Sequence, residues 1–129
     1  MIVLDTHIWI WWVNDSPRLT KQYRQWIRDY QPQGLGISVI SCWEVAKLVE
    51  KNRLVLSIPV EEWLQLALAY SGVRLLDLTV PIIVQSTRLT GFHNDPADQI
   101  IVATAKVYDC LLLTADNKIL NYPEVKTLK

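Results

Sequence analysis

Short apolar runs alternate along the chain with stretches of helical spacing. Buried strands are predicted from aliphatic-rich runs at Met1–Leu4, Ile37–Ile40, Val73–Leu78 and Leu111–Thr114. Helices are predicted from capping residues and from apolar spacings of three and four, over residues 8–13, 20–30, 41–51, 59–71, 79–89 and 95–108. A helical turn at 116–120 and an edge strand at 125–128 follow. Strands that alternate with helices predict an α/β fold, with a central parallel sheet and helices on both faces.

The first predicted helix, Ile8–Val13, is apolar around most of its circumference. Helical geometry places Trp9, Trp12 and Val13 on one face, which we expect to pack on the sheet. Complete burial of the helix is not expected in a domain this small. The opposite face, which carries Trp11, is therefore predicted to form an exposed patch for a protein partner.

The length and composition predict a folded chain, and the charged residues give it no net charge. With 129 residues, 50% of them apolar and 20% charged, residues 1–129 are predicted to form one domain. Thirteen Lys and Arg balance thirteen Asp and Glu, so any polyanion would have to be held locally. No signal peptide or membrane span is predicted, and Cys42 and Cys110 suit buried thiols in a reducing compartment. We therefore expect a cytoplasmic protein.

Four acidic residues lie where strands and helices meet, at Asp5, Glu44, Asp98 and Asp116. Ligands of open parallel sheets bind beyond the carboxyl ends of the strands, so these side chains are predicted to converge at one edge. Each also has a local explanation, because an acid near a helix N-terminus stabilises it by roughly 0.3 to 1 kcal/mol. Asp77 meets the same criterion and is interpreted as a turn or cap residue, so position alone does not establish chemistry.

The joint occurrence of these acids favours a metal site over four separate caps. Two carboxylates about 5 Å apart repel by roughly 3 kcal/mol at an effective dielectric constant near 20, which exceeds what a cap returns. A divalent cation would remove that repulsion. Oxygen ligands without a His or Cys cluster favour Mg²⁺ or Mn²⁺ over zinc. Such ions activate water and neutralise charge during phosphodiester hydrolysis, which is the chemistry we expect.

Four sequence blocks in this order resemble the PIN-domain ribonucleases of the VapC type: Val3-Leu4-Asp5-Thr6-His7, Ser41-x-Trp43-Glu44, His93-x-Asp95-Pro96-Ala97-Asp98 and Leu113-Thr114-x-Asp116. The resemblance covers nearly the whole chain. It implies a sheet of about four to five parallel strands and an Mg²⁺- or Mn²⁺-dependent endoribonuclease that cleaves RNA. It also implies the toxin of a toxin–antitoxin pair, with a VapB-like antitoxin as partner and a homodimer as the assembly.

The resemblance also implies a role for each matching residue. The core catalytic and metal-binding acids would be Asp5, Glu44 and Asp98, with Asp116 as the fourth metal-binding acid. Auxiliary roles would fall to Asp95, Thr6 and Thr114, the two hydroxyl groups orienting a carboxylate or a water. Structural hydrogen bonds are expected for His7 and His93, and a cap for Ser41. Gln99 departs from the family, which commonly has Arg there, and this puts a local ion pair in doubt.

Three other functions are considered for a small α/β domain that carries acids. A receiver-like signalling domain could use Asp77 as its phosphate acceptor, but it needs a pair of acids after the first strand, and Asp5 is followed by Thr6 and His7. An aspartyl phosphatase needs a second Asp where His7 stands. A PIN fold that only binds partners is the remaining alternative, and the presence of all four acids argues against it.

Overall fold

The computed structural model describes residues 1–129, and its centre is a sheet of four parallel strands. The strands are β1 (Ile2–Leu4), β2 (Leu35–Ser38), β3 (Val73–Leu76) and β4 (Leu111–Leu113). Their order in the sheet is β3-β2-β1-β4, so β1 lies in the middle, with Val3 opposite both Gly36 and Leu112. The predicted α/β fold with a parallel sheet is confirmed.

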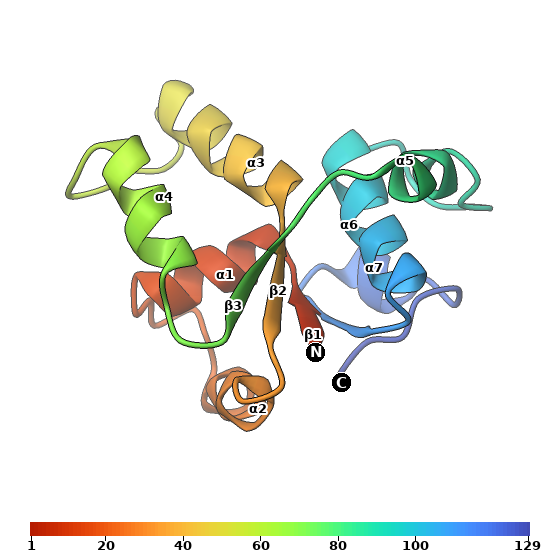
Figure 1. Cartoon of the computed structure of the whole chain (residues 1–129), viewed down its shortest axis with the longest axis horizontal. Helices are drawn as coiled ribbons and strands as arrows, with labels where there is room; N and C mark the ends of the chain where they lie inside the picture. The colour runs from red at the N-terminus through yellow and green to blue at the C-terminus, as the bar shows by residue number, and fades with distance from the viewer.

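Seven helices cover the sheet: α1 (Thr6–Val13), α2 (Lys21–Tyr30), α3 (Val39–Glu50), α4 (Val60–Leu68), α5 (Val80–Ser86), α6 (Pro96–Val107) and α7 (Asn117–Leu120). Figure 1 shows α1 to α4 on one side of the strands and α5 to α7 on the other. The central strand divides its side chains accordingly. Ile2 and Leu4 belong to a core cluster with the first group of helices, whereas Val3 belongs to a second cluster with α6 and α7. This is the alternation that a strand buried on both faces requires.

Strand β2 and helix α3 both begin two residues earlier in the chain than predicted. The strand begins at Leu35, and α3 begins at Val39 because the side chain of Ser38 caps it by accepting a hydrogen bond from Ile40 N–H at 3.2 Å. The predicted cap at Ser41 is therefore wrong, and Glu44 lies in the second turn of the helix instead of the first.

Helix α1 begins earlier and is more buried than predicted. Asp5 is its N-cap, and Trp9 is fully buried with its ring 5.2 Å from that of Trp63 in an edge-to-face arrangement. Trp12 packs edge-to-face on Tyr70 at 5.1 Å. Trp11 is only partly exposed and lines the cavity at the carboxyl ends of the strands, so it forms no fully exposed patch, and its contact with a partner stays a prediction.

The C-terminal tail returns to the sheet without forming a full strand. Thr127 makes one parallel bridge with Leu112, where an edge strand was predicted. Cys42 and Cys110 are free thiols, as expected, but both are partly exposed and not buried. None of the helices combines the length and the apolar character needed to cross a bilayer.

Candidate active site

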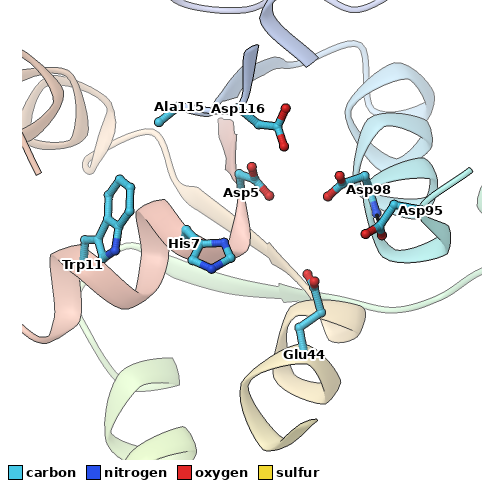
Figure 2. Close-up of a pocket in the computed structure, with 8 residues that line it drawn as sticks. All are labelled: Asp5, His7, Trp11, Glu44, Asp95, Asp98, Ala115 and Asp116. Atoms are coloured by element: carbon cyan, nitrogen blue, oxygen red, sulfur yellow. Dashed lines mark hydrogen bonds between the residues drawn. The ribbon is translucent and has the colours of Figure 1, made fainter. Parts of the chain in front are cut away.

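The carboxyl ends of the central strands open onto a cavity of about 300 Å³. Asp5 follows β1, Asp116 follows β4 as the N-cap of α7, and Asp98 lies in the first turn of α6. Glu44 reaches the cavity from α3, and Figure 2 shows the four carboxyl groups directed toward a shared space. The structure thus brings together all four acids that the sequence predicted. Asp95 lines the same cavity.

Asp5 is held rigidly at the base of this cavity. It is 6% exposed, its Oδ1 accepts a hydrogen bond from Thr6 N–H at 2.8 Å, and its Oδ2 accepts one from the Thr114 hydroxyl at 2.7 Å. Burial raises the pKa of Asp5, while these hydrogen bonds and His7 oppose the shift. Because each carboxylate oxygen has two lone pairs, one on each remains for a ligand in the cavity.

Glu44 is oriented by the hydroxyl group of Thr6 on α1, which also contacts Ser41 on the same helix as Glu44. The Thr6 hydroxyl donates a hydrogen bond to Glu44 Oε1 and shares another, of 2.8 Å, with the buried Ser41 hydroxyl. Burial raises the pKa of Glu44, the bond from Thr6 lowers it, and Asp5 and Asp95 raise it further. Ser41 therefore supports the Thr6–Glu44 contact instead of capping a helix.

Asp98 has the most perturbed carboxyl group of the cluster. Burial, followed by the charges of the neighbouring acids Asp5, Asp95, Asp116 and Glu44, raises its pKa to about 8. His93 Nε2 lies 3.2 Å from Asp98 Oδ2, an ion pair when the imidazole is protonated, but the geometry is not that of a hydrogen bond and leaves this buried nitrogen unpaired. No other basic side chain pairs with Asp98, so ionising this carboxyl group is unfavourable and it keeps its proton to a higher pH than a free aspartic acid.

The two remaining acids have capping contacts as well as positions in the cavity. Asp95 Oδ1 accepts a hydrogen bond from Asp98 N–H at 3.1 Å, and Asp116 Oδ1 accepts one from Lys118 N–H at 2.8 Å. The backbone N–H of Asp116 donates to the Thr114 hydroxyl at 3.0 Å. Thr114 therefore joins Asp5 to the loop that carries Asp116, and the cap interpretation of these acids is compatible with a shared site.

The donor set of the cavity suits a hard divalent cation, although it is not a preformed coordination shell. No three of its carboxylate, imidazole or thiolate groups lie close enough together to surround one ion. Five of the eight lining residues supply carboxylate oxygens, which Mg²⁺ and Mn²⁺ prefer, and His7 supplies the one imidazole. Mg²⁺ commonly keeps several waters and needs only one or two protein carboxylates. The raised pKa of Asp98 marks the position where a positive charge would stabilise the protein most.

Sequence reasoning missed two residues that line the cavity and misjudged the role of one. His7 and Trp11, one turn apart on α1, both face the cavity, with ring centroids 6.1 Å apart. Their spacing after Asp5 could have indicated this. His7 is exposed and its side chain forms no hydrogen bond within the chain, so the structural hydrogen bond predicted for it is not found. Gln99 makes no ion pair; its side chain donates to the His93 carbonyl at 3.0 Å. Asp77 is exposed on the edge strand side and does not line the cavity.

Comparisons with known proteins agree with the fold and the order of these elements. The family model described as the PIN domain matches residues 2–125. Ribonuclease VapC22 of Mycobacterium tuberculosis is 34% identical over 119 residues, which span 92% of this chain and 88% of that protein.

Two solved structures have the same fold over almost their whole length. VapBC2 from Rickettsia felis, bound to a promoter DNA fragment, matches with a TM-score of 0.70 and 18% identity over 99% of this chain and 98% of that chain. FitAcB from Neisseria gonorrhoeae matches with a TM-score of 0.70 and 23% identity, over 100% of this chain and 97% of that chain. The family match and the 34% identity together show that this chain belongs to the PIN-domain family, among its VapC-type members.

Proposed function

We propose that this protein is a divalent-metal-dependent endoribonuclease and the toxin of a toxin–antitoxin pair. The observation that carries the proposal is the convergence of Asp5, Glu44, Asp98 and Asp116, from four separate elements, on one cavity. Burial, followed by the charges of the neighbouring acids, raises the pKa of Asp98 to about 8, so the ionised cluster opposes folding unless it serves a ligand. The relationship to Ribonuclease VapC22 supports RNA as the substrate.

The chemistry requires a cation, which one or two carboxylates of this cluster would hold together with water. A bound Mg²⁺ or Mn²⁺ would supply positive charge beside the scissile phosphate and acidify the attacking water. The protein positions these acids: Thr114 and Thr6 N–H hold Asp5, and the Thr6 hydroxyl holds Glu44. Asp95 adds negative charge and caps α6. These contacts keep the carboxylates directed into the cavity, so little reorganisation is needed when substrate arrives.

The contacts of the acids also distinguish this proposal from its alternatives. A receiver domain would use Asp77 with a pair of acids after β1, but Asp77 is exposed outside the cavity and Asp5 has no acidic neighbour in the chain. A module that only binds partners would gain nothing from a destabilising cluster at the strand ends. The nuclease proposal explains why the cluster is kept.

The partners follow from the family. A VapB-like antitoxin is proposed to neutralise the activity, and a homodimer is proposed as the assembly, located in the cytoplasm. We also propose that residues 1–129 act as one PIN domain. Size-exclusion chromatography with light scattering, alone and with a coexpressed antitoxin, measures both associations.

The direct test is cleavage of labelled single-stranded RNA by purified protein with Mn²⁺, with Mg²⁺ and with excess EDTA. Cleavage is expected with either metal and absent in EDTA. Asp5→Asn should abolish it, whereas Asp77→Asn, a matched change at a strand end outside the cavity, should leave it intact. Cleavage that persists in EDTA, or in the Asp5→Asn protein, would refute the proposal.

A further inference from the structure

A second cavity, of about 250 Å³, continues from the carboxylate cavity along the outer face of α3. The two cavities share Glu44 and Asp95 in their walls. The carboxylate cavity contains no Lys or Arg, but the second is lined by Lys47, Lys51 and Arg53. Local positive charge therefore lies beside the carboxylates of a protein whose net charge is zero.

The cations of this second cavity are free to bind a ligand. Lys51 and Arg53 are exposed and form no ion pair within the chain. Lys47 pairs with Glu50 at 3.0 Å, an exposed contact of little energetic weight. Helical spacing puts Lys47 and Lys51 one turn apart, and the stripe from residue 43 to 51 is about 12 Å long at 1.5 Å per residue. That length can contact more than one phosphate.

Trp43 is the exposed aromatic side chain of the same stripe. It is 54% exposed, and the Lys47 ammonium lies 5.8 Å from its ring centroid. The residue that follows it in the chain is Glu44, which lines both cavities. An exposed indole beside cations is the combination with which proteins bind single-stranded nucleic acid, because bases stack on the ring while Lys and Arg contact phosphates.

We propose that this basic groove, defined by Trp43, Lys47, Lys51 and Arg53, binds an unpaired segment of the RNA substrate next to the scissile phosphate. A base of that segment stacks on Trp43, and its flanking phosphates contact Lys51 and Arg53. The inference rests on the proposed ribonuclease function and adds a site on this chain, outside the carboxylate cavity, for an unpaired segment of the substrate. A base within a duplex is already stacked and paired, so its face is not available to Trp43.

The experiment measures single-turnover cleavage of a short unstructured oligoribonucleotide in Mn²⁺ over a range of protein concentrations. Trp43→Ala should raise the half-saturating concentration about tenfold, in the range for loss of one stacked base, while Trp43→Phe should restore most of the affinity. Lys51→Gln combined with Arg53→Gln should lower the slope of log affinity against log salt by about 1.4, since each phosphate contact on a single strand contributes about 0.7. A duplex of the same sequence should be cleaved poorly.

Replacing single nucleotides of the substrate by base-free analogues separates stacking from a structural effect. Removing the base at one position near the cut should weaken RNA binding by the wild type about tenfold. The same removal should not weaken RNA binding by the Trp43→Ala protein any further. Matched controls come from exposed residues outside the groove: Tyr108→Ala for the aromatic change, and Lys126→Gln with Lys129→Gln for the charge change. These controls should match the wild type.

The outcomes separate this inference from the function on which it rests. If Asp5→Asn abolishes cleavage but the groove variants match the controls, the basic groove is not an RNA site while the nuclease function stands. If the groove variants lose only antitoxin binding, the surface belongs to a protein partner and the inference is overturned. If the wild type cleaves no RNA with either metal, the proposed function fails, and the inference fails with it.

Discussion

Removing the charge of Asp98 should stabilise the metal-free protein, and increasingly so as the pH rises. The folded protein holds the Asp98 proton up to a pKa of about 8, whereas the unfolded chain releases it near 3.8. Between these values the folded state binds more protons than the unfolded state, so stability is lost as the pH rises. Below pH 3.8 both states are protonated and the effect vanishes; above pH 8 both are ionised and the loss is complete.

The magnitude follows from the two pKa values. Full linkage amounts to about 1.4 kcal/mol per pH unit, or about 3 to 4 kcal/mol between pH 5 and pH 8. The Asp98 side chain is 15% exposed, so water relieves part of this loss. We expect about 2 kcal/mol for Asp98→Asn relative to the wild type at pH 8, and much less at pH 5. A helix-cap role alone predicts a neutral or destabilising change of up to about 1 kcal/mol at every pH.

The assay is urea unfolding in EDTA from pH 5 to pH 8, followed by the fluorescence of the six tryptophans. Added Mg²⁺ at pH 8 should stabilise the wild type by about 2.7 kcal/mol at one hundred times its dissociation constant, and Asp98→Asn much less. Asp77→Asn, which changes an exposed acid outside the cavity, is the control and should retain the wild-type pH dependence. If Asp98→Asn is less stable than the wild type at pH 8 and gains equally from Mg²⁺, the acids are caps and the metal site is refuted.

One product analysis and three substitutions test the chemistry and the packing. Cleavage by an attacking water should leave 5′-phosphate and 3′-hydroxyl ends by mass spectrometry; a 2′,3′-cyclic phosphate would contradict it. Thr114→Val removes the hydroxyl that holds Asp5 and should lower the cleavage rate constant about 10- to 100-fold, with activity largely retained in Thr114→Ser. Trp9→Ala should cost about 3 to 5 kcal/mol of unfolding free energy, because the ring is fully buried against Trp63; a loss below 1 kcal/mol would argue against this packing. Ser38→Ala should cost about 1 kcal/mol by chemical denaturation if α3 is capped there, and nothing if it is not.

Much of the fold could be predicted because the local signals are strong. Apolar runs flanked by caps placed all four strands within a few residues, and Pro96 with Asp95 located the start of α6. The start of α3 was misplaced because Ser38 and Ser41 are equally good caps in isolation. Only the structure shows Ser41 buried and hydrogen-bonded to Thr6 on another element. The exposure of Trp11 was overestimated because the sequence does not reveal that its face of the helix borders a cavity.

The site could be predicted only as a set of acids at one sheet edge. Topology explains this success, since parallel strands bring their carboxyl ends to the same edge. The contacts that orient the acids join residues that are far apart in the chain, such as Thr114 with Asp5 and Thr6 with Glu44. Periodicity carries no information about such pairs, so the hydroxyl residues could be suspected from the family resemblance but their partners could not be assigned.

These long-range hydrogen bonds explain how a repulsive cluster persists in a folded protein. A carboxylate with a free rotamer would turn away from its neighbours and reduce the repulsion. Asp5 cannot do so because both of its oxygens are held, and Glu44 is held by Thr6. Asp98 has no hydrogen bond to its carboxyl group, and burial, followed by the charges of these neighbours, raises its pKa to about 8. The hydroxyl groups of Thr6 and Thr114 thus stabilise individual acids while keeping their carboxylates close together. A bound cation would offset the repulsion between these carboxylates and would be held by them.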